Sequence, residues 1–195
     1  MSATEINEIA LRLAERVFNQ RLIANEYRGA FVEAMIDPYL EPFGWRFVGD
    51  GWSGWDFEHA PSRSRLEVKR SAAQQSWPTD KPTRGVFDIA PRKGYYEGGS
   101  KYEAVPGRCA QTYVFAWNGF FDPKDDRQPD HVTPQTDHRD PSQWEFYVVP
   151  ASRLPQEQRT LSLGKVRELR APVEIKKLGL AVNQVAFSPS GSDVD

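Results

Sequence analysis

The sequence predicts an α/β fold, because helical patterns near its start are followed by a series of strand-like runs. Residues 3–22 place isoleucine, leucine and valine at helical spacing, and residues 25–40 show a second helical pattern. Residues 111–117 form a continuous apolar run of the kind found in a buried central strand. Residues 143–150 predict a further strand. Helices and strands therefore alternate along the chain.

The middle and end of the chain add shorter elements. Residues 45–59 suggest aromatic strands interrupted by glycines, and residues 65–69 (RLEVK) predict another strand. Residues 71–77 (SAAQQSW) favour a short helix that Pro78 would stop. Residues 159–169 predict a strand that passes into a helix.

Composition indicates one globular domain. The 195 residues suffice for one domain with a real core, and 39% are hydrophobic. We predict a single domain over residues 1–187 and a disordered tail over residues 188–195. No apolar run reaches the roughly 18 residues that span a bilayer, and the lone Cys109 fits a reducing compartment. The expectation is a cytoplasmic protein that does not contact membranes.

Positive charge is concentrated in the middle of the chain. Residues 61–110 carry ten Lys and Arg against five Asp and Glu, whereas residues 1–60 carry five against ten. A basic stretch of this kind is compatible with a surface that faces phosphates, and a mixed solvated face gives a similar count.

An acid and an acid-x-lysine triplet occupy two neighbouring strand-like runs. Side chains alternate along a strand, so Glu67 and Lys69 share one face, and pairing of the two runs would place Asp56 beside Glu67. Two carboxylates with the backbone carbonyl of Val68 would form a hard oxygen site suited to Mg²⁺. The simpler alternative is an ordinary solvated hairpin.

The triplet alone is weak evidence, because about one acid-x-lysine match is expected by chance from this composition. The chain contains three: Glu67-Val-Lys69, Asp122-Pro-Lys124 and Glu174-Ile-Lys176. The first is distinguished by its context, since only it has a second acid at hairpin distance.

Asp56, ten intervening residues and Glu67-Val68-Lys69 resemble the signature of the PD-(D/E)xK, or restriction-endonuclease-like, nuclease superfamily. The segment YRGAFVEAMI resembles the first-helix motif of that superfamily, with Glu33 as the matching acid and Glu26 as an alternative. The segment RSAAQQSW resembles a later motif, in which Gln75 matches a recurrent glutamine. These motifs lie within residues 25–117. Trp55 stands where the superfamily's name has proline.

The resemblance implies an αβββαβ core with a mixed central β-sheet flanked by helices, and Mg²⁺-dependent (or Mn²⁺-dependent) hydrolysis of phosphodiester bonds. Asp56, Glu67, the Val68 carbonyl and Glu33 would then contact the metal. Lys69 would orient the attacking water or stabilise the developing charge, and Gln75 would position phosphate or Lys69.

The expected substrate is DNA, with RNA and a homodimeric state left open, in a restriction, defence or DNA-processing role. The candidate nucleic-acid contacts are the basic side chains Arg70, Arg92, Lys93 and Lys101. The alternative is a catalytically silent nuclease-like module that binds nucleic acid or a protein partner. A complete set of Asp56, Glu67 and Lys69 favours the enzyme, because a silent relative would usually have lost one of them.

A second set of possible metal ligands lies in the loop DHVTPQTDHRD, which contains His131 and His138. The loop lacks the ligand spacing of a zinc site. We expect it to be mobile and solvated.

Overall fold

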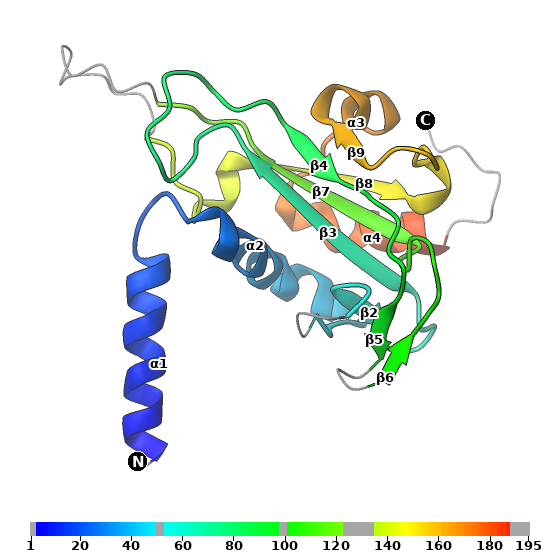
Figure 1. The fold of residues 1–195 in the computed structure, drawn as a ribbon, viewed down its shortest axis with the longest axis horizontal. Coiled ribbons are helices and arrows are strands. Elements are labelled where there is room, and N and C mark those ends of the chain that lie inside the picture. Colours follow the sequence, from blue (N-terminus) through cyan, green and yellow to red (C-terminus); the bar gives the residue numbers. More distant parts are fainter. Residues whose placement is uncertain (1–2, 50–52, 98–100, 123–134, 188–195) are drawn as a thin grey trace.

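The computed structural model describes residues 3–49, 53–97, 101–122 and 135–187, and its centre is a five-stranded mixed sheet (Figure 1). The strands stand in the order β1-β2-β3-β7-β8. Their bounds are β1 Trp45–Phe47, β2 Phe57–His59, β3 Arg65–Ala72, β7 Thr112–Asn118 and β8 Trp144–Pro150. The α/β class predicted from the sequence is confirmed.

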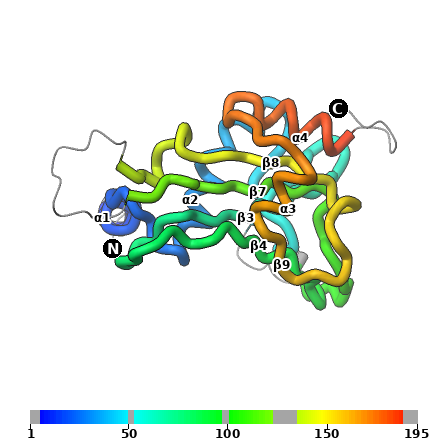
Figure 2. The backbone as a smooth tube through the Cα atoms, turned by 90° about the horizontal axis from the view of Figure 1, so that it is seen from above, coloured from blue at the N-terminus to red at the C-terminus, as the bar shows by residue number. Residues whose placement is uncertain are grey.

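The pairing of β3 with β7 is the single parallel pairing within this sheet. β1, β2 and β3 form an antiparallel meander, β3 and β7 are parallel, and β7 and β8 are antiparallel. In Figure 2 the chain paths of β3, β7 and β8 run side by side. The predicted adjacency of the two acid-bearing runs is confirmed, because Phe57 pairs with Leu66 and Glu58 with Arg65.

The connection from β3 to β7 contains strands where the αβββαβ pattern has a helix. It carries β4 (Val86–Asp88), β5 (Tyr95–Glu97) and β6 (Lys101–Glu103). β5 pairs with β6, and β4 pairs with β9 (Thr160–Ser162). Among the described residues of this connection none is helical. The helix predicted over residues 71–77 is therefore wrong.

The reason lies in the ladder between β3 and β7. Ser71 pairs with Trp117 and Ala72 with Asn118, so the start of the segment prolongs the strand. The amide of Gln75 then donates to the carbonyl of Ala72 at 2.9 Å and closes a local turn. Strand pairing with a distant segment outweighs the modest helix propensity of alanine and glutamine.

Two hydrophobic clusters cover the two faces of the sheet. One contains side chains of α2 (Asn25–Leu40) and α4 (Leu178–Phe187) packed on Leu66, Val68 and Val114. The other contains side chains of β4, β9 and α3 (Leu163–Leu169) packed on Tyr113 and Phe115. Single-turn 3₁₀ helices complete the fold at Glu41–Phe43, Pro141–Gln143, Ala151–Arg153 and Ile175–Lys177.

Helix α1 (Ala3–Phe18) projects from this body (Figure 1). Its helical pattern was predicted, but the apolar side chains Ile6, Ile9, Leu11 and Leu13 are more than half exposed. The helix joins the body through Phe18, whose ring packs on Tyr27 and Phe31. No helix among the described residues has the length and apolar character needed to cross a bilayer. The predicted tail, residues 188–195, lies outside the described residues.

Candidate functional site

Asp56 is fixed where β2 and β3 separate. Its backbone N–H donates to the carbonyl of Leu66 at 3.0 Å, and its own carbonyl accepts from the N–H of Val48 at 2.8 Å. Its carboxylate Oδ2 accepts from the backbone N–H of Val68 at 2.6 Å. Both ends of the residue are therefore held, and the carboxylate lies against the free edge of β3.

The same contact orients the peptide group of Val68. Within a strand the N–H and C=O of one residue point to the same side. The Val68 N–H points to Asp56, so its carbonyl lies on that same edge of β3, beyond the end of β2. The Val68 carbonyl, which the sequence predicts as a metal ligand, therefore lies on the same edge of β3 as the Asp56 carboxylate.

Glu67, which precedes Val68 on β3, is almost completely buried, with 3% exposure. Alternation along β3 directs it to the face of Tyr113, its partner in β7. Its Oε1 accepts from Lys69 Nζ and, at 3.0 Å, from Arg92 Nη2. Its Oε2 is buried and has no hydrogen-bond partner. A buried carboxylate oxygen without a partner is costly, and a cation or a bound water would relieve that cost.

Burial and like charges raise the pKa of Asp56. Burial is the largest cause, followed by the negative charges of Glu67 and Glu33, and together they raise its pKa to about 7. The Val68 N–H and the charge of Lys69 oppose this rise. Asp56 therefore changes protonation state near neutral pH, and any cation bound beside it would favour the ionised form.

Helix α2 brings Glu33 to this cluster. Burial raises the pKa of Glu33, and the charges of Arg70, Glu67 and Lys69 also act on it. Glu26, which lies nearer the start of α2, is exposed. Of the two candidate acids on α2, Glu33 is the one whose charge acts on the carboxylates of the hairpin.

A cavity of about 240 Å³ opens beside Glu67 and Lys69. Glu67, Lys69 and Arg92 line it, together with Asp88 at the end of β4 and Arg108. It therefore combines two acidic side chains with three basic ones. A phosphate and a divalent cation together would complement such a lining.

The cluster fits a metal ion that needs only one or two protein carboxylates. Among the residues that the structure describes, no three or more His, Cys, Asp or Glu side chains are grouped as ligands of one ion. Mg²⁺ retains several waters and is commonly held by one or two carboxylates. The unpartnered Oε2 of Glu67 and the Asp56 carboxylate are chemically suited to that smaller role.

The remaining candidate residues are divided among three places. Arg92 lies at the cluster, where it donates to Glu67 and, at 3.2 Å, to the carbonyl of Ser53. Lys101 lies on β6 and pairs with Glu103 at 2.5 Å. Lys93 is exposed just before β5.

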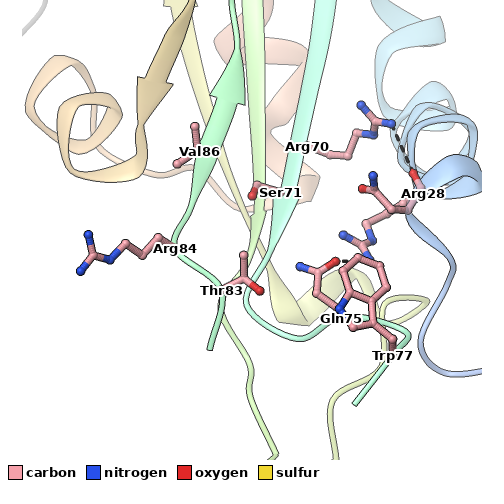
Figure 3. A pocket seen from close by; sticks show the side chains of 9 residues that line it. Arg28, Arg70, Ser71, Gln75, Trp77, Thr83, Arg84 and Val86 are labelled. Atoms are coloured by element: carbon pink, nitrogen blue, oxygen red, sulfur yellow. Dashed lines mark hydrogen bonds between the residues drawn. The ribbon is translucent and has the colours of Figure 1, made fainter. Parts of the chain in front are cut away.

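Gln75 and Arg70 belong to a second, separate cavity, which is shown in Figure 3. The amide of Gln75 accepts from Arg28 Nη2 at 3.2 Å and donates to the carbonyl of Ala72, so no contact links it to Lys69. Arg28 itself was not singled out from the sequence. The available signal was its place on a buried stripe of α2, followed at intervals of four by Val32, Ile36 and Leu40.

The expectation of a solvated loop is wrong for His138, and His131 lies outside the described residues. His138 is fully buried, and its Nδ1 accepts from the backbone N–H of Ile23 at 3.0 Å. Burial and the nearby charge of Arg28 lower its pKa to about 4. His138 is therefore a neutral core residue that ties the loop to the start of α2.

Comparison of the chain with models of protein families, with curated proteins and with solved structures finds no match.

Proposed function

We propose that the chain is a metal-dependent nuclease of the restriction-endonuclease-like type, acting on DNA in the cytoplasm. The observation that carries this proposal is the buried Glu67, whose Oε2 has no partner while Asp56 and Lys69 stand beside it. An ordinary solvated hairpin would leave all three groups in water. The meander β1-β2-β3 followed by the parallel β7 also agrees with the first part of an αβββαβ core.

The residues would divide the work as follows. Asp56 and Glu67, with the Val68 carbonyl, would hold Mg²⁺, which when bound polarises the scissile phosphate and acidifies a water molecule. The Val68 N–H keeps the Asp56 carboxylate in place, and Arg92 fixes Glu67 through Oε1 while leaving Oε2 free.

Lys69 would act on the phosphate. Its ammonium group lies at Glu67 and lines the cavity of about 240 Å³. A cation at that position stabilises the negative charge that builds up on the phosphoryl oxygens in the transition state. Glu33 would contribute negative charge from α2 and orient water bound at the cluster.

A specific observation favours the alternative, a catalytically silent module that binds nucleic acid or a protein. Glu67 is already paired with both Lys69 and Arg92, so its charge is compensated within the chain. Such a module would keep the basic lining and would need no metal.

Incubation with supercoiled plasmid and with single-stranded DNA, in Mg²⁺, Mn²⁺ or EDTA, separates the two. The enzyme cuts at least one substrate in metal and neither in EDTA. The silent module binds DNA equally well with and without metal and cuts nothing.

A further inference from the structure

The second cavity, of about 490 Å³, lies where the end of β3 meets the start of α2. Two arginines, Arg28 of α2 and Arg70 of β3, reach it from one side, and Arg84 extends away from both (Figure 3). The hydroxyl groups of Ser71 and Thr83 lie between them in this view. Among the residues that the structure describes, no Asp or Glu contributes to the lining.

Arg28 is held rigidly although it is charged and only 1% exposed. Its Nη2 donates to the carbonyl of Ile23 and to Gln75 Oε1, each at 3.2 Å. Its Nε is buried without a partner. The guanidinium group is therefore oriented by the fold while part of its hydrogen-bonding capacity is unused.

Arg70 is placed beside it by a close backbone approach. Its Nη2 donates to the carbonyl of Asn25 at 3.4 Å, and its Nε is also buried without a partner. Gly29 makes room for it, because a Cβ at that position would lie 3.1 Å from Arg70 Nε. A Cβ at residue 29 would require the guanidinium group of Arg70 to shift by a few tenths of an ångström.

Neither positive charge is paired with a carboxylate in the described part of the chain. No carboxylate there forms an ion pair with Arg28 or Arg70, although Glu33 acts on Arg70 at longer range. Burial and the charge of Arg70 lower the pKa of Arg28 to about 10. The start of the 16-residue helix α2 adds its own partial positive charge at the same place.

We propose that this cavity binds the phosphate monoester of a nucleotide, either a free nucleoside monophosphate or the phosphorylated end of a nucleic-acid strand. A monoester carries close to two negative charges at neutral pH and therefore matches two guanidinium groups, whereas an internal diester carries one. Trp77 stands at the rim with 53% exposure, so the base of the bound nucleotide has an aromatic face on which to stack.

The proposal rests on the proposed function only for the strand-end case. Ser71 and Glu67 are four residues apart on β3, which corresponds to about 13 Å along a strand. A phosphorylated end in the second cavity would thus place the carboxylate cluster a few nucleotides away. A free nucleotide would bind in the same way without any cleavage.

The test measures binding in EDTA, where metal-dependent cleavage is excluded. Thermal unfolding is followed with inorganic phosphate, adenosine 5′-monophosphate and adenosine. Fluorescence anisotropy then compares one labelled oligonucleotide carrying a 5′-phosphate, a 3′-phosphate or only hydroxyl ends. The variants are Arg28→Gln, Arg70→Gln and, as a matched control, Arg159→Gln, which is exposed and outside the cavity.

We expect the monophosphate to bind about ten- to a hundredfold more tightly than adenosine, since charged hydrogen bonds to phosphate contribute on that scale. Both cavity variants should lose this preference, and Arg159→Gln should keep it. If Arg28→Gln fails to fold, the half-buried Arg70 provides the test alone. A preference for a phosphorylated oligonucleotide identifies the strand end, and a preference confined to the monophosphate identifies the free nucleotide.

Equal binding of adenosine and its monophosphate by the wild-type chain overturns the proposal, and so does a phosphate preference that survives both cavity variants. A protein that cuts no DNA but keeps this preference retains the phosphate site and overturns the nuclease function. A protein that cuts DNA without this phosphate preference retains the nuclease function and overturns the phosphate site.

Discussion

Replacing Asp56 with asparagine removes the ionisable group at the centre of the carboxylate cluster while keeping its shape. The asparagine side-chain oxygen can still accept from the Val68 N–H that now bonds Oδ2 at 2.6 Å. The variant lacks only the negative charge that Glu67 and Glu33 oppose. The stability of the variant relative to the wild type therefore reports the repulsion between the carboxylates of the cluster.

The magnitude follows from the pKa of Asp56, which rises from 3.8 to about 7 in the folded protein. An acid with a raised folded-state pKa binds more protons folded than unfolded, so the wild type loses stability as pH rises between these two values. The full loss is about 4 kcal/mol, of which about 3 kcal/mol falls between pH 5 and pH 8. For a domain of this size that is roughly 6–12 °C in Tm.

The assay is thermal unfolding in EDTA from pH 5 to pH 8, plotted as the Tm of Asp56→Asn minus that of the wild type. The difference cancels other titrations, including that of His138, whose lowered pKa acts in the opposite direction. We expect the difference to grow with pH, and Glu174→Gln, an exposed acid outside the cluster, to follow the wild type. Parallel curves for Asp56→Asn and the wild type would refute the raised pKa and the crowded cluster with it.

Three further predictions concern the same residues. Lys69→Ala should lower the cleavage rate by about a hundredfold or more, with little change in DNA affinity, because the charge of Lys69 acts mainly in the transition state. The control is Lys176→Ala, in the exposed triplet Glu174-Ile-Lys176. A Lys69→Ala protein that cuts as fast as Lys176→Ala would remove Lys69 from the site. Glu33→Gln should slow cleavage while Glu26→Gln does not, since only Glu33 acts on the cluster; equal rates for the two variants would place Glu33 outside it. Addition of Mg²⁺ at pH 6.5 should release up to about one proton per chain, because a bound cation favours ionised Asp56. Calorimetry in buffers of different ionisation heat measures the number of protons released. Proton release that persists in Asp56→Asn would contradict this assignment.

Sequence reasoning identified the hairpin because its signals are local. Alternation along β3 fixes the shared face of Glu67 and Lys69, and a short turn limits where Asp56 can lie. The choice between Glu33 and Glu26 could not be made this way, because both lie on one helix. The packing of α2 on the sheet, a tertiary effect, decides it.

Features built from distant segments were missed. The strand that continues through Ser71 and Ala72 depends on pairing with β7, more than forty residues later in the chain. His138 is buried because Ile23 and Trp144 close around it, although its surrounding sequence is polar. Arg28 and Gln75 likewise meet only after the chain has folded. In each case long-range contacts outweigh the local composition.

The most direct test of the nuclease proposal is the rate of supercoiled plasmid cleavage in Mg²⁺ by the wild type, Glu67→Gln and Glu174→Gln, measured side by side. Glutamine preserves the size of residue 67 but removes the charge that would hold the metal. We expect cleavage by the wild type and Glu174→Gln at equal rates, and none by Glu67→Gln. Cleavage by Glu67→Gln at the wild-type rate would contradict it.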